Sequence, residues 1–364
     1  MKKHSKVPTK RSVKPEFTVG LDLGDKSSHY CILNTDGELM EEGKVRSTEA
    51  GLRKQFGDEP RMRIGLEAGT HSAWVNRLLA ELGHEVIVAN PRKLRAITSN
   101  ESKNDRNDAE MLARLASCDP KLLSPIRHRG VDKQQDLNLV RTRAALVRAR
   151  TMLINAVRGL VKSAGGRLRS CSSDSFADKA RASVPPELRS ACEPLLEQIA
   201  HMKLTIRAMD KQVEALEEKY PEIAILRTVP GVGPLVAACY VLTMDSPHIL
   251  HTNRQAGAFL GLRPRQSQSG ESDPQNRISR TGNTYLRSLL VQSAQHVLGP
   301  FGPPSALRQW GLQLAGRGGK SAKRRAIIAV ARKLAVMLYS MWRSGSKFEP
   351  FPQGSIQTAA PVAA

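Results

Sequence analysis

The order of apolar runs between residues 17 and 89 restricts the fold of this chain more than any other feature. The expected elements, in order, are strands at 17–23, 29–33 and 39–45, a helix at 48–56, a strand at 61–67, a helix at 72–82 and a strand at 85–89. Asp36 and Gly37 form the turn between the second and third strands. An antiparallel opening followed by alternating helix and strand predicts an α/β domain with a mixed sheet.

Two of the expected strands carry a carboxylate at their end. Asp22 interrupts the apolar run 17–23 just before Gly24, and Glu67 closes the strand at 61–67 before a strand-to-helix turn. A lone carboxylate in a buried strand is costly unless a metal ion, a cation or backbone donors stabilise it. We therefore expect both acids at one edge of the sheet, beside a stabilising partner.

A second pair of acids lies in the stretch 102–115. Apolar spacing predicts a helix from about Asp105, which puts Asp105 and Asp108 on one helix face. Such a pair is tolerated at a helix start, where the dipole favours anions, or around a divalent cation. Together with Asp22 and Glu67, the pair supplies the four carboxylates that two Mg²⁺ ions need for phosphodiester chemistry.

In combination these motifs resemble the DEDD-type transposases of bacterial insertion sequences, the insertion-sequence 110 family. The resemblance covers about 17–342 and rests on Gly20–Gly24, on Glu67 at a strand end, on Asn104–Ala109 and on a C-terminal block described below. It implies a RuvC-like N-terminal domain with a ribonuclease H-like α/β fold. It also implies that Mg²⁺, in a two-metal site, is bound by the catalytic residues Asp22, Glu67, Asp105 and Asp108.

The charge of the chain fits a nucleic-acid partner independently. Lys and Arg number 56 against 34 Asp and Glu, a formal charge of +22. The low aromatic content of 4% favours phosphate contacts over base stacking. The five cysteines show no metal or redox spacing, and no signal peptide or membrane span is expected, which indicates a cytoplasmic, nucleoid-associated protein without a membrane partner.

The middle of the chain predicts long helices. Apolar residues at helical spacing predict a basic amphipathic helix from about residue 132 to 164. A second series alternates spacings of four and three, which predicts a coiled-coil seam made of Leu195, Ile199, Met202, Ile206, Met209, Val213 and Leu216. The seam suits two helices of one chain or an interface between protomers. The resemblance implies oligomeric assembly and favours a dimer or tetramer formed through the coiled coil.

The C-terminal part carries two motifs suited to phosphate. Residues 226–234 look like the turn of a helix-hairpin-helix motif, in which Gly231 and Gly233 let backbone N–H groups reach a phosphate, although an ordinary tight turn is the alternative. The block 257–287 matches the family's C-terminal signature. Its arginines are placed to bind phosphates bidentately, and they are Arg263, Arg265, Arg277, Arg280 and Arg287. A final helix at 321–342 has an apolar and a basic face.

By resemblance, a serine of this block is the nucleophile and joins the four carboxylates in a composite site. Ser269, before Gly270, best matches the family position, and Ser267 is the competitor. A serine oxygen must be activated by a metal or base, and a phosphoserine intermediate would conserve bond energy for rejoining. The resemblance further implies that element ends and target DNA are chosen through a structured guide RNA.

The domain order we expect has five parts: a disordered basic arm at 1–16, a RuvC-like catalytic domain at 17–130, a helical coiled-coil linker at 131–220, a mainly α transposase domain at 221–343 and a flexible tail at 344–364. Three alternatives stay open. The chain could be a junction-resolving nuclease that uses water and no serine, or a non-catalytic architectural protein. The run Gly20–Gly24 also resembles the phosphate loop of actin-like ATPases, but no second phosphate loop follows it.

Overall fold

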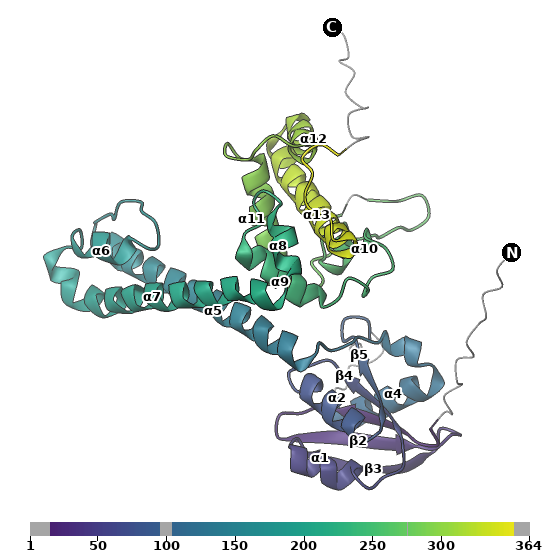
Figure 1. Cartoon of the computed structure of the whole chain (residues 1–364). Helices are drawn as coiled ribbons and strands as arrows, with labels where there is room; N and C mark the ends of the chain where they lie inside the picture. The colour runs from purple at the N-terminus through teal and green to yellow at the C-terminus, as the bar shows by residue number, and fades with distance from the viewer. Residues whose placement is uncertain (1–14, 95–103, 275, 353–364) are drawn as a thin grey trace. The chain divides into compact units, whose positions relative to one another are not determined.

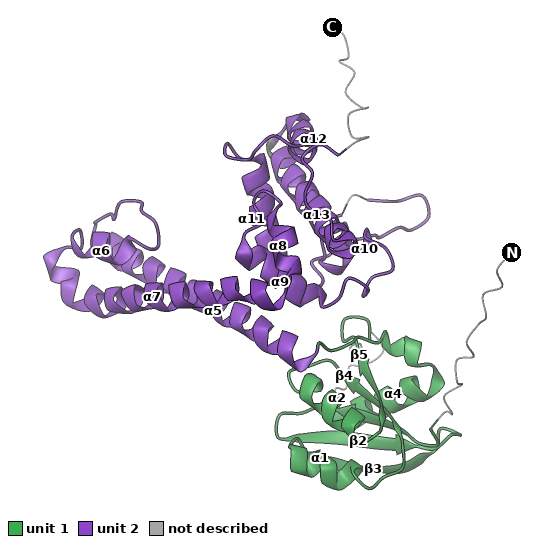
Figure 2. Cartoon of the chain, viewed as in Figure 1, with its two compact units in different colours: residues 1–129 green, residues 130–364 purple. Residues whose placement is uncertain are grey.

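The computed structural model describes residues 15–94, 104–274 and 276–352. Nearly all of the expected basic arm (1–16), the first two residues of the stretch 102–115 and the end of the expected tail (344–364) lie outside the described residues. The chain divides into two compact units, residues 1–129 and 130–364, and each is treated by itself below (Figure 2). The finer division into linker, transposase domain and tail stays a prediction.

The first unit is built on one five-stranded sheet (Figure 1). Its strands are β1 (Thr18–Asp22), β2 (Ser27–Leu33), β3 (Leu39–Arg46), β4 (Arg63–Glu67) and β5 (Glu85–Ala89), in the order β3-β2-β1-β4-β5. The first three strands pair antiparallel, whereas β4 is parallel to β1 and β5 to β4. The expected mixed sheet is confirmed, and it is compatible with a ribonuclease H-like fold.

Different helices cover the two faces of this sheet. Helices α1 (Glu49–Phe56) and α2 (Ser72–Glu81) pack on the face that carries Val19, Leu21, Ile64 and Leu66. Helix α4 (Asp105–Cys118) packs on the other face. Successive side chains of a strand point to opposite faces, so Thr18, Gly20 and Asp22 of β1 lie on the α4 face.

Two glycines let α4 approach the centre of the sheet. A Cβ atom at Gly20 would lie 1.9 Å from the carbonyl oxygen of Ala109 and 2.4 Å from the nitrogen of Ala113. A Cβ at Gly65 would lie 3.2 Å from the Cβ of Ala116. The backbone of α4 therefore rests directly on β1 and β4, which no larger residue at Gly20 permits.

The second unit starts with a hairpin of two long helices, α5 (Val131–Ser163) and α7 (Arg189–Lys219), which lie side by side in Figure 1. The start of α5 packs near the end of α7, and the end of α5 near the start of α7, so the pair is antiparallel. A short helix, α6 (Phe176–Arg181), lies in the connection and packs on the same core.

The expected seam of α7 packs within this chain. Ile199, Ile206, Val213 and Leu216 are buried, and the remaining seam positions Leu195, Met202 and Met209 are half-buried. Their partner helix is α5, so the seam packs two helices of one chain, the first of the two expected arrangements. The homo-oligomer stays a prediction, and this seam, already covered by α5, is not the surface for a second protomer.

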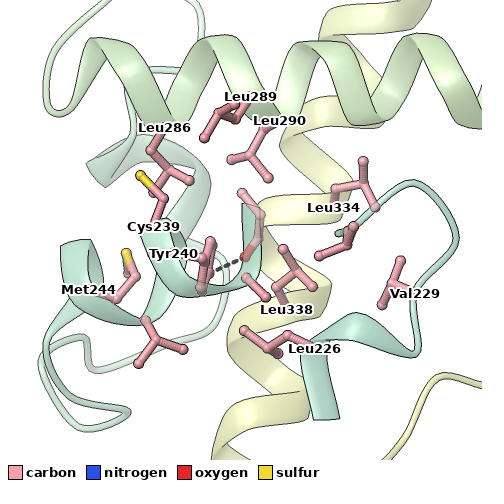
Figure 3. Packing of buried hydrophobic residues seen from close by; sticks show 14 of the residues in the cluster. Leu226, Val229, Cys239, Tyr240, Met244, Leu286, Leu289, Leu290, Leu334 and Leu338 are labelled. Atoms are coloured by element: carbon pink, nitrogen blue, oxygen red, sulfur yellow. Dashed lines mark hydrogen bonds between the residues drawn. The ribbon is translucent and has the colours of Figure 1, made fainter. Parts of the chain in front are cut away.

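The rest of the second unit is mostly helical, as expected. It contains α8 (Glu222–Arg227), α9 (Pro234–Met244), α10 (Gln255–Phe259), α11 (Thr284–Leu298), α12 (Ala306–Gly316) and α13 (Lys320–Ser344). Helix α9 is buried from Ala237 to Met244, and the hydroxyl of its Tyr240 donates to the carbonyl of Ala335 at 2.6 Å. Figure 3 shows Tyr240 among leucines of α11 and α13. Across the residues that the structure describes, no helix has the length and apolar composition needed to span a membrane.

Candidate active site and nucleic-acid interface

Asp22 and Glu67 end two adjacent parallel strands. The pairing of β1 with β4 runs up to Leu21 and Leu66, and the next residue on each strand is one of these carboxylates. Leu21 and Leu66 face the core under α1 and α2, so Asp22 and Glu67 lie on the α4 face. Both acids line one hollow of about 430 Å³, whose other lining residues are Leu23, Asp25, Ala68, Gly69, Thr70 and His71.

Helix α4 brings the other two acids toward the same edge. Its sheet-facing stripe consists of Ala109, Leu112, Ala113 and Ala116. Asp105 and Asp108 precede Ala109 and Leu112 by one turn each and extend this stripe at the N-terminal end of the helix.

The direction of α4 decides where these acids lie. Arg63, at the start of β4, donates to the carbonyl of Ala116 near the end of α4 at 3.4 Å. The helix is thus antiparallel to β1 and β4, and its acidic first turn lies at the carboxyl ends of those strands.

Local contacts fix the first turn of α4. The side chain of Asn104 accepts a hydrogen bond from the backbone nitrogen of Arg106 at 3.1 Å and caps the helix. The guanidinium of Arg106 donates from Nε to Glu42 of β3 at 2.7 Å. The first turn of α4, which carries Asp105 and Asp108, is therefore held in place by the Asn104 cap and by the contact of Arg106 with the sheet.

His29 connects the two pairs of acids, and the sequence analysis missed it. It pairs with Asp22 across the antiparallel strands, and its Nε2 lies 4.0 Å from Oδ2 of Asp105. His29 shares a strand face with the buried Cys31 and Leu33. A polar residue that ends an apolar strand face was the available signal.

His71 and Asp25 were also missed, and they lie at the rim of the hollow. The indole nitrogen of Trp74 donates to Nδ1 of His71 at 3.2 Å, and Nε2 of His71 lies 3.5 Å from Oδ1 of Asp25. Both residues belong to connecting segments without a periodic pattern, so the sequence held no signal for them.

The donor set of this edge fits a hard divalent cation, because carboxylate oxygens are the ligands that such ions prefer. Asp22 and Glu67 share the hollow, whereas Asp105 and Asp108 do not line it, and the Asp105 side chain is 65% exposed. In the described parts of the chain, no three acidic, histidine or cysteine side chains come close enough together to hold one ion. The structure thus collects the four acids at one edge of the sheet, two of them in a hollow and two on the adjoining helix end.

The one cysteine under α4 is not a competing nucleophile. Cys31 is buried, and burial, reinforced by the nearby carboxylates of Glu110 and Glu42, raises the pKa of its thiol to about 11. The thiol therefore stays protonated near neutral pH.

Ser269 lies at the tip of a ribbon between α10 and α11. Its nitrogen donates to the carbonyl of Ser272 at 3.1 Å, and the nitrogen of Ser272 donates back at 3.0 Å. Gly270 closes the turn with a φ of +56°, a conformation that glycine adopts without strain. The competitor Ser267 forms no ribbon pairing with the residues that the structure describes, and both serines are exposed.

Three of the predicted arginines share one face of this ribbon. Pro264 and Ile278 form a bridge, and Ile278 packs on the core of the second unit. Side chains alternate along each strand, so the neighbouring positions Arg263, Arg265 and Arg277 lie on the opposite face. Arg265 and Arg277 lie directly across from each other, where like charges repel unless an anion lies between them. Arg280, also exposed, follows at the base with a φ of +56°.

Arg287 differs from the other arginines of the block. Its side chain is 8% exposed, and its guanidinium donates to the carbonyls of Leu260 at 3.1 Å and Thr281 at 2.7 Å. These carbonyls flank the ribbon on either side. Arg287 therefore holds the base of the ribbon together, and its burial gives no support to a direct phosphate contact.

Replacing Arg287 with alanine is expected to lower the free energy of unfolding by about 2 to 4 kcal/mol, because buried carbonyls lose their donor. Urea denaturation of the full chain measures this. The matched control is Arg263→Ala, an exposed position, for which we expect a change within about 0.5 kcal/mol. Equal small effects in both variants would show that Arg287 does not hold the ribbon.

The predicted hairpin of glycines joins α8 to α9. Gly231 has a φ of +81°, and a Cβ there would lie 3.0 Å from Cδ2 of His296 and 3.1 Å from the carbonyl of Ser293 on α11. Gly233 is the N-cap of α9, and Pro234 occupies its first turn. The turn thus connects two helices as expected and packs closely on a third. Whether it acts as a helix-hairpin-helix motif stays a prediction.

The sequence resembles two family models of known proteins. Residues 19–165 match a model of the DEDD domain of IS110 transposases, described as a transposase. Residues 223–310 match a model described as the transposase IS116/IS110/IS902 family. The first match includes all four acids, and the second includes the glycine hairpin, Ser269 and the five arginines of the block.

Individual relatives agree with these matches. A probable family 20 transposase of Pseudomonas aeruginosa is 29% identical over 77% of this chain and 83% of the relative. The transposase for insertion sequence element IS1111A of Coxiella burnetii is 26% identical over 91% of both chains. The pilin gene-inverting protein of Moraxella lacunata is 28% identical over 42% of this chain and 48% of the relative.

Proposed function

Because the chain belongs to the IS110 family of transposases, an enzyme class that cuts and rejoins DNA, we propose that it does so with Ser269 as the nucleophile and with Mg²⁺ bound by Asp22, Glu67, Asp105 and Asp108. The DEDD domain type implies a divalent-metal site. The choice of Mg²⁺, the two-metal stoichiometry and the serine chemistry are the proposal. The substrates are the ends of the element and its target DNA.

One observation carries this proposal. Gly20 and Gly65 allow α4 to pack directly on the sheet. Because α4 runs antiparallel to β1 and β4, its acidic first turn lies at the carboxyl ends of these strands, where Asp22 and Glu67 lie. Acids from two strands and a helix, far apart in sequence, are thereby gathered on one face. A cation bound there supplies positive charge that stabilises the developing charge on the reacting phosphate.

The serine step forms one bond and breaks another. The Oγ of Ser269 gives up its proton and forms an ester bond to a backbone phosphorus, the phosphodiester bond to the departing DNA oxygen breaks, and that oxygen takes up a proton. The phosphoserine conserves the energy of the broken bond, so attack by a new DNA hydroxyl rejoins the strand and frees the serine. The hydrogen-bonded tip of the ribbon supports Ser269 over Ser267, because a fixed nucleophile loses less entropy on reaction.

The exposed arginines of the ribbon are the proposed DNA contacts. Arg263, Arg265 and Arg277 form one cationic face near the serine, and Arg280 lies at its base. The like charges at Arg265 and Arg277 favour a bound phosphate, which both guanidinium groups can reach. Gly231 and Gly233 are a second proposed backbone contact, and Arg287 acts by holding the ribbon.

A structured guide RNA and a homo-oligomer complete the proposal. The formal charge of +22 is compatible with a second polyanion beside the DNA and does not by itself distinguish RNA from DNA. The resemblance supports RNA as that polyanion. A dimer or tetramer would use faces of the α5–α7 hairpin outside the seam, such as those that expose Met152 and Leu204.

The metal site is tested with Asp22→Asn. The protein is incubated with Mg²⁺, end-labelled DNA of the element junction and RNA from the element's non-coding flank, and strand cleavage is measured by denaturing electrophoresis. We expect the rate of cleavage to fall by more than about 100-fold. Mutating a residue that only hydrogen-bonds to a metal ligand already lowers activity by up to about 100-fold, and Asp22 is a proposed ligand itself. Chelation of Mg²⁺ by EDTA is expected to have the same effect on the wild type.

Asp58→Asn is the matched control, since it removes the same charge from an exposed position of the same unit. Its cleavage rate is expected to equal that of the wild type. Cleavage by Asp22→Asn at the wild-type rate would show that Asp22 does not bind the metal. Binding without any cleavage by the wild type would point to the architectural role instead.

A further inference from the structure

A second hollow, in the second unit, lies between the glycine hairpin and α11. It measures about 500 Å³ and is lined by Arg227–Gly233 and Val236 on one side and by Leu289, Gln292, Ser293 and His296 on the other. The residues from α11 follow the spacing of one helix face, and three of them are polar. Among the described residues that line it there is no Asp or Glu. The hollow is therefore built for a polar ligand without positive charge.

Ser293 is the observation that points to a ligand. The residue is 3% exposed, and its hydroxyl has no hydrogen-bond partner among the described residues. A buried hydroxyl without a partner costs about 1 to 3 kcal/mol, and an alanine at this position would avoid that cost. Native proteins satisfy nearly all such groups, so the hydroxyl needs a partner from outside the chain.

The hairpin side supplies backbone donors. Helix α9 has 11 residues and begins at this hollow with Gly233 as its N-cap, so no side chain caps its first N–H groups. Its first turn contains no acidic residue. The partial positive charge of a helix N-terminus favours an anion at that end.

The two sides of the hollow are in direct contact. Gly231 lies so close to Ser293 and His296 that a Cβ would be 3.1 Å from the carbonyl of Ser293 and 3.0 Å from Cδ2 of His296. Because Gly231 also has a φ of +81°, only glycine fits the turn at this distance. The α9 end and the polar face of α11 are thus held together as one site.

We propose that this hollow binds one phosphodiester phosphate of a nucleic-acid backbone, with Gln292, Ser293 and His296 completing the site that the hairpin begins. The Ser293 hydroxyl, the Gln292 amide and the N–H groups at the start of α9 donate to the phosphate oxygens. The contact reads no sequence, and it fixes the register of the duplex on the second unit. The inference rests on the proposed function in one respect, since that function makes nucleic acid the ligand.

The test uses the full chain and a matched pair of variants. Gln292→Glu puts a carboxylate into the hollow, whereas Gln295→Glu puts the same charge on an exposed position of α11 outside it. Fluorescence anisotropy measures the affinity for a labelled duplex DNA of unrelated sequence and for the corresponding duplex RNA. We expect Gln292→Glu to weaken binding about tenfold or more, and Gln295→Glu to change it less than about threefold. Equal weakening by both would overturn the proposal.

Ser293→Ala separates binding from folding. Loss of an unpartnered buried hydroxyl is expected to leave the melting temperature unchanged or raise it, while affinity falls about threefold or more. Unchanged affinity in this variant and in Gln292→Glu would overturn the inference and leave the proposed function intact. Failure of the wild type to bind either nucleic acid would overturn the proposed function itself. If the variants weaken binding of only one nucleic acid, RNA or DNA, the bound phosphate belongs to that nucleic acid.

Discussion

Replacing Ser269 with alanine is expected to abolish the covalent protein–DNA adduct and to lower strand exchange by more than about 10³-fold, as loss of a nucleophile commonly does. Ser269 is exposed at the tip of its ribbon, and its pairing with Ser272 uses backbone atoms only. The substitution should therefore leave the fold unchanged and DNA affinity within about twofold. Denaturing electrophoresis with Mg²⁺, end-labelled junction DNA and the flanking RNA detects the adduct as a band of lower mobility.

Ser267→Ala is the control for this experiment. It removes the same hydroxyl from the same exposed ribbon, and it should form the adduct at the wild-type rate. An adduct that disappears only in Ser267→Ala would make Ser267 the nucleophile. Cleavage that depends on Mg²⁺ but persists in both variants without an adduct would establish the junction-resolving nuclease, in which water attacks the phosphate.

The second large effect is expected from Gly20→Ala, a position that touches no substrate. The added methyl would lie 1.9 Å from the carbonyl oxygen of Ala109 and 2.4 Å from the nitrogen of Ala113, and a backbone cannot yield as a side chain can. Helix α4 must move off the sheet, which we expect to cost about 3 kcal/mol of unfolding free energy, at the upper end of overpacking effects. Strand cleavage should be lost as well, because α4 carries Asp105 and Asp108.

Thermal unfolding of the full chain measures this change, with Gly159→Ala as the matched control. Gly159 lies on the exposed side of α5, where a Cβ would meet nothing within 4 Å. Alanine there should stabilise the helix by up to about 1 kcal/mol. A Gly20→Ala variant that melts and cleaves like the wild type would show that close packing of α4 on β1 does not position the acids.

The sequence predicted those parts of the fold that depend on local periodicity. The strands β1 to β5, the helix that starts at Asp105 and the long helices α5 and α7 all follow from apolar spacing, which sets which side chains share a face. The helix expected at 48–56 is α1, and the side chain of Thr48 caps it by accepting a hydrogen bond from the backbone nitrogen of Gly51 at 3.1 Å, a contact between near neighbours.

The ribbon at 261–281 was not predicted. No secondary structure was predicted for this part of the block 257–287, since the segment around Gln266–Gly270 has no apolar alternation that would indicate a strand. The ribbon is held by a few backbone hydrogen bonds between its two strands and by the turn at Gly270. Arg287 was grouped with the exposed arginines because it belongs to the same signature block, although its partners are carbonyls on either side of the ribbon.

The seam of α7 shows the same division. The spacing of Ile199, Ile206 and Val213 determined that α7 has one apolar stripe, but it could not name the helix that covers it. Only the tertiary structure shows that α5 of the same chain covers this stripe.

By itself, then, the sequence determined most of the helices and strands, the presence of four acids of the type that binds divalent cations, and the excess of positive charge that favours a polyanion, because periodicity, residue type and charge are local or summed properties. The tertiary structure alone decided that Gly20 admits α4, that His29 lies between Asp22 and Asp105, and that the buried Ser293 hydroxyl has no hydrogen-bond partner among the described residues. Each of these facts depends on a distance between residues that are far apart along the chain, and no local pattern records such a distance.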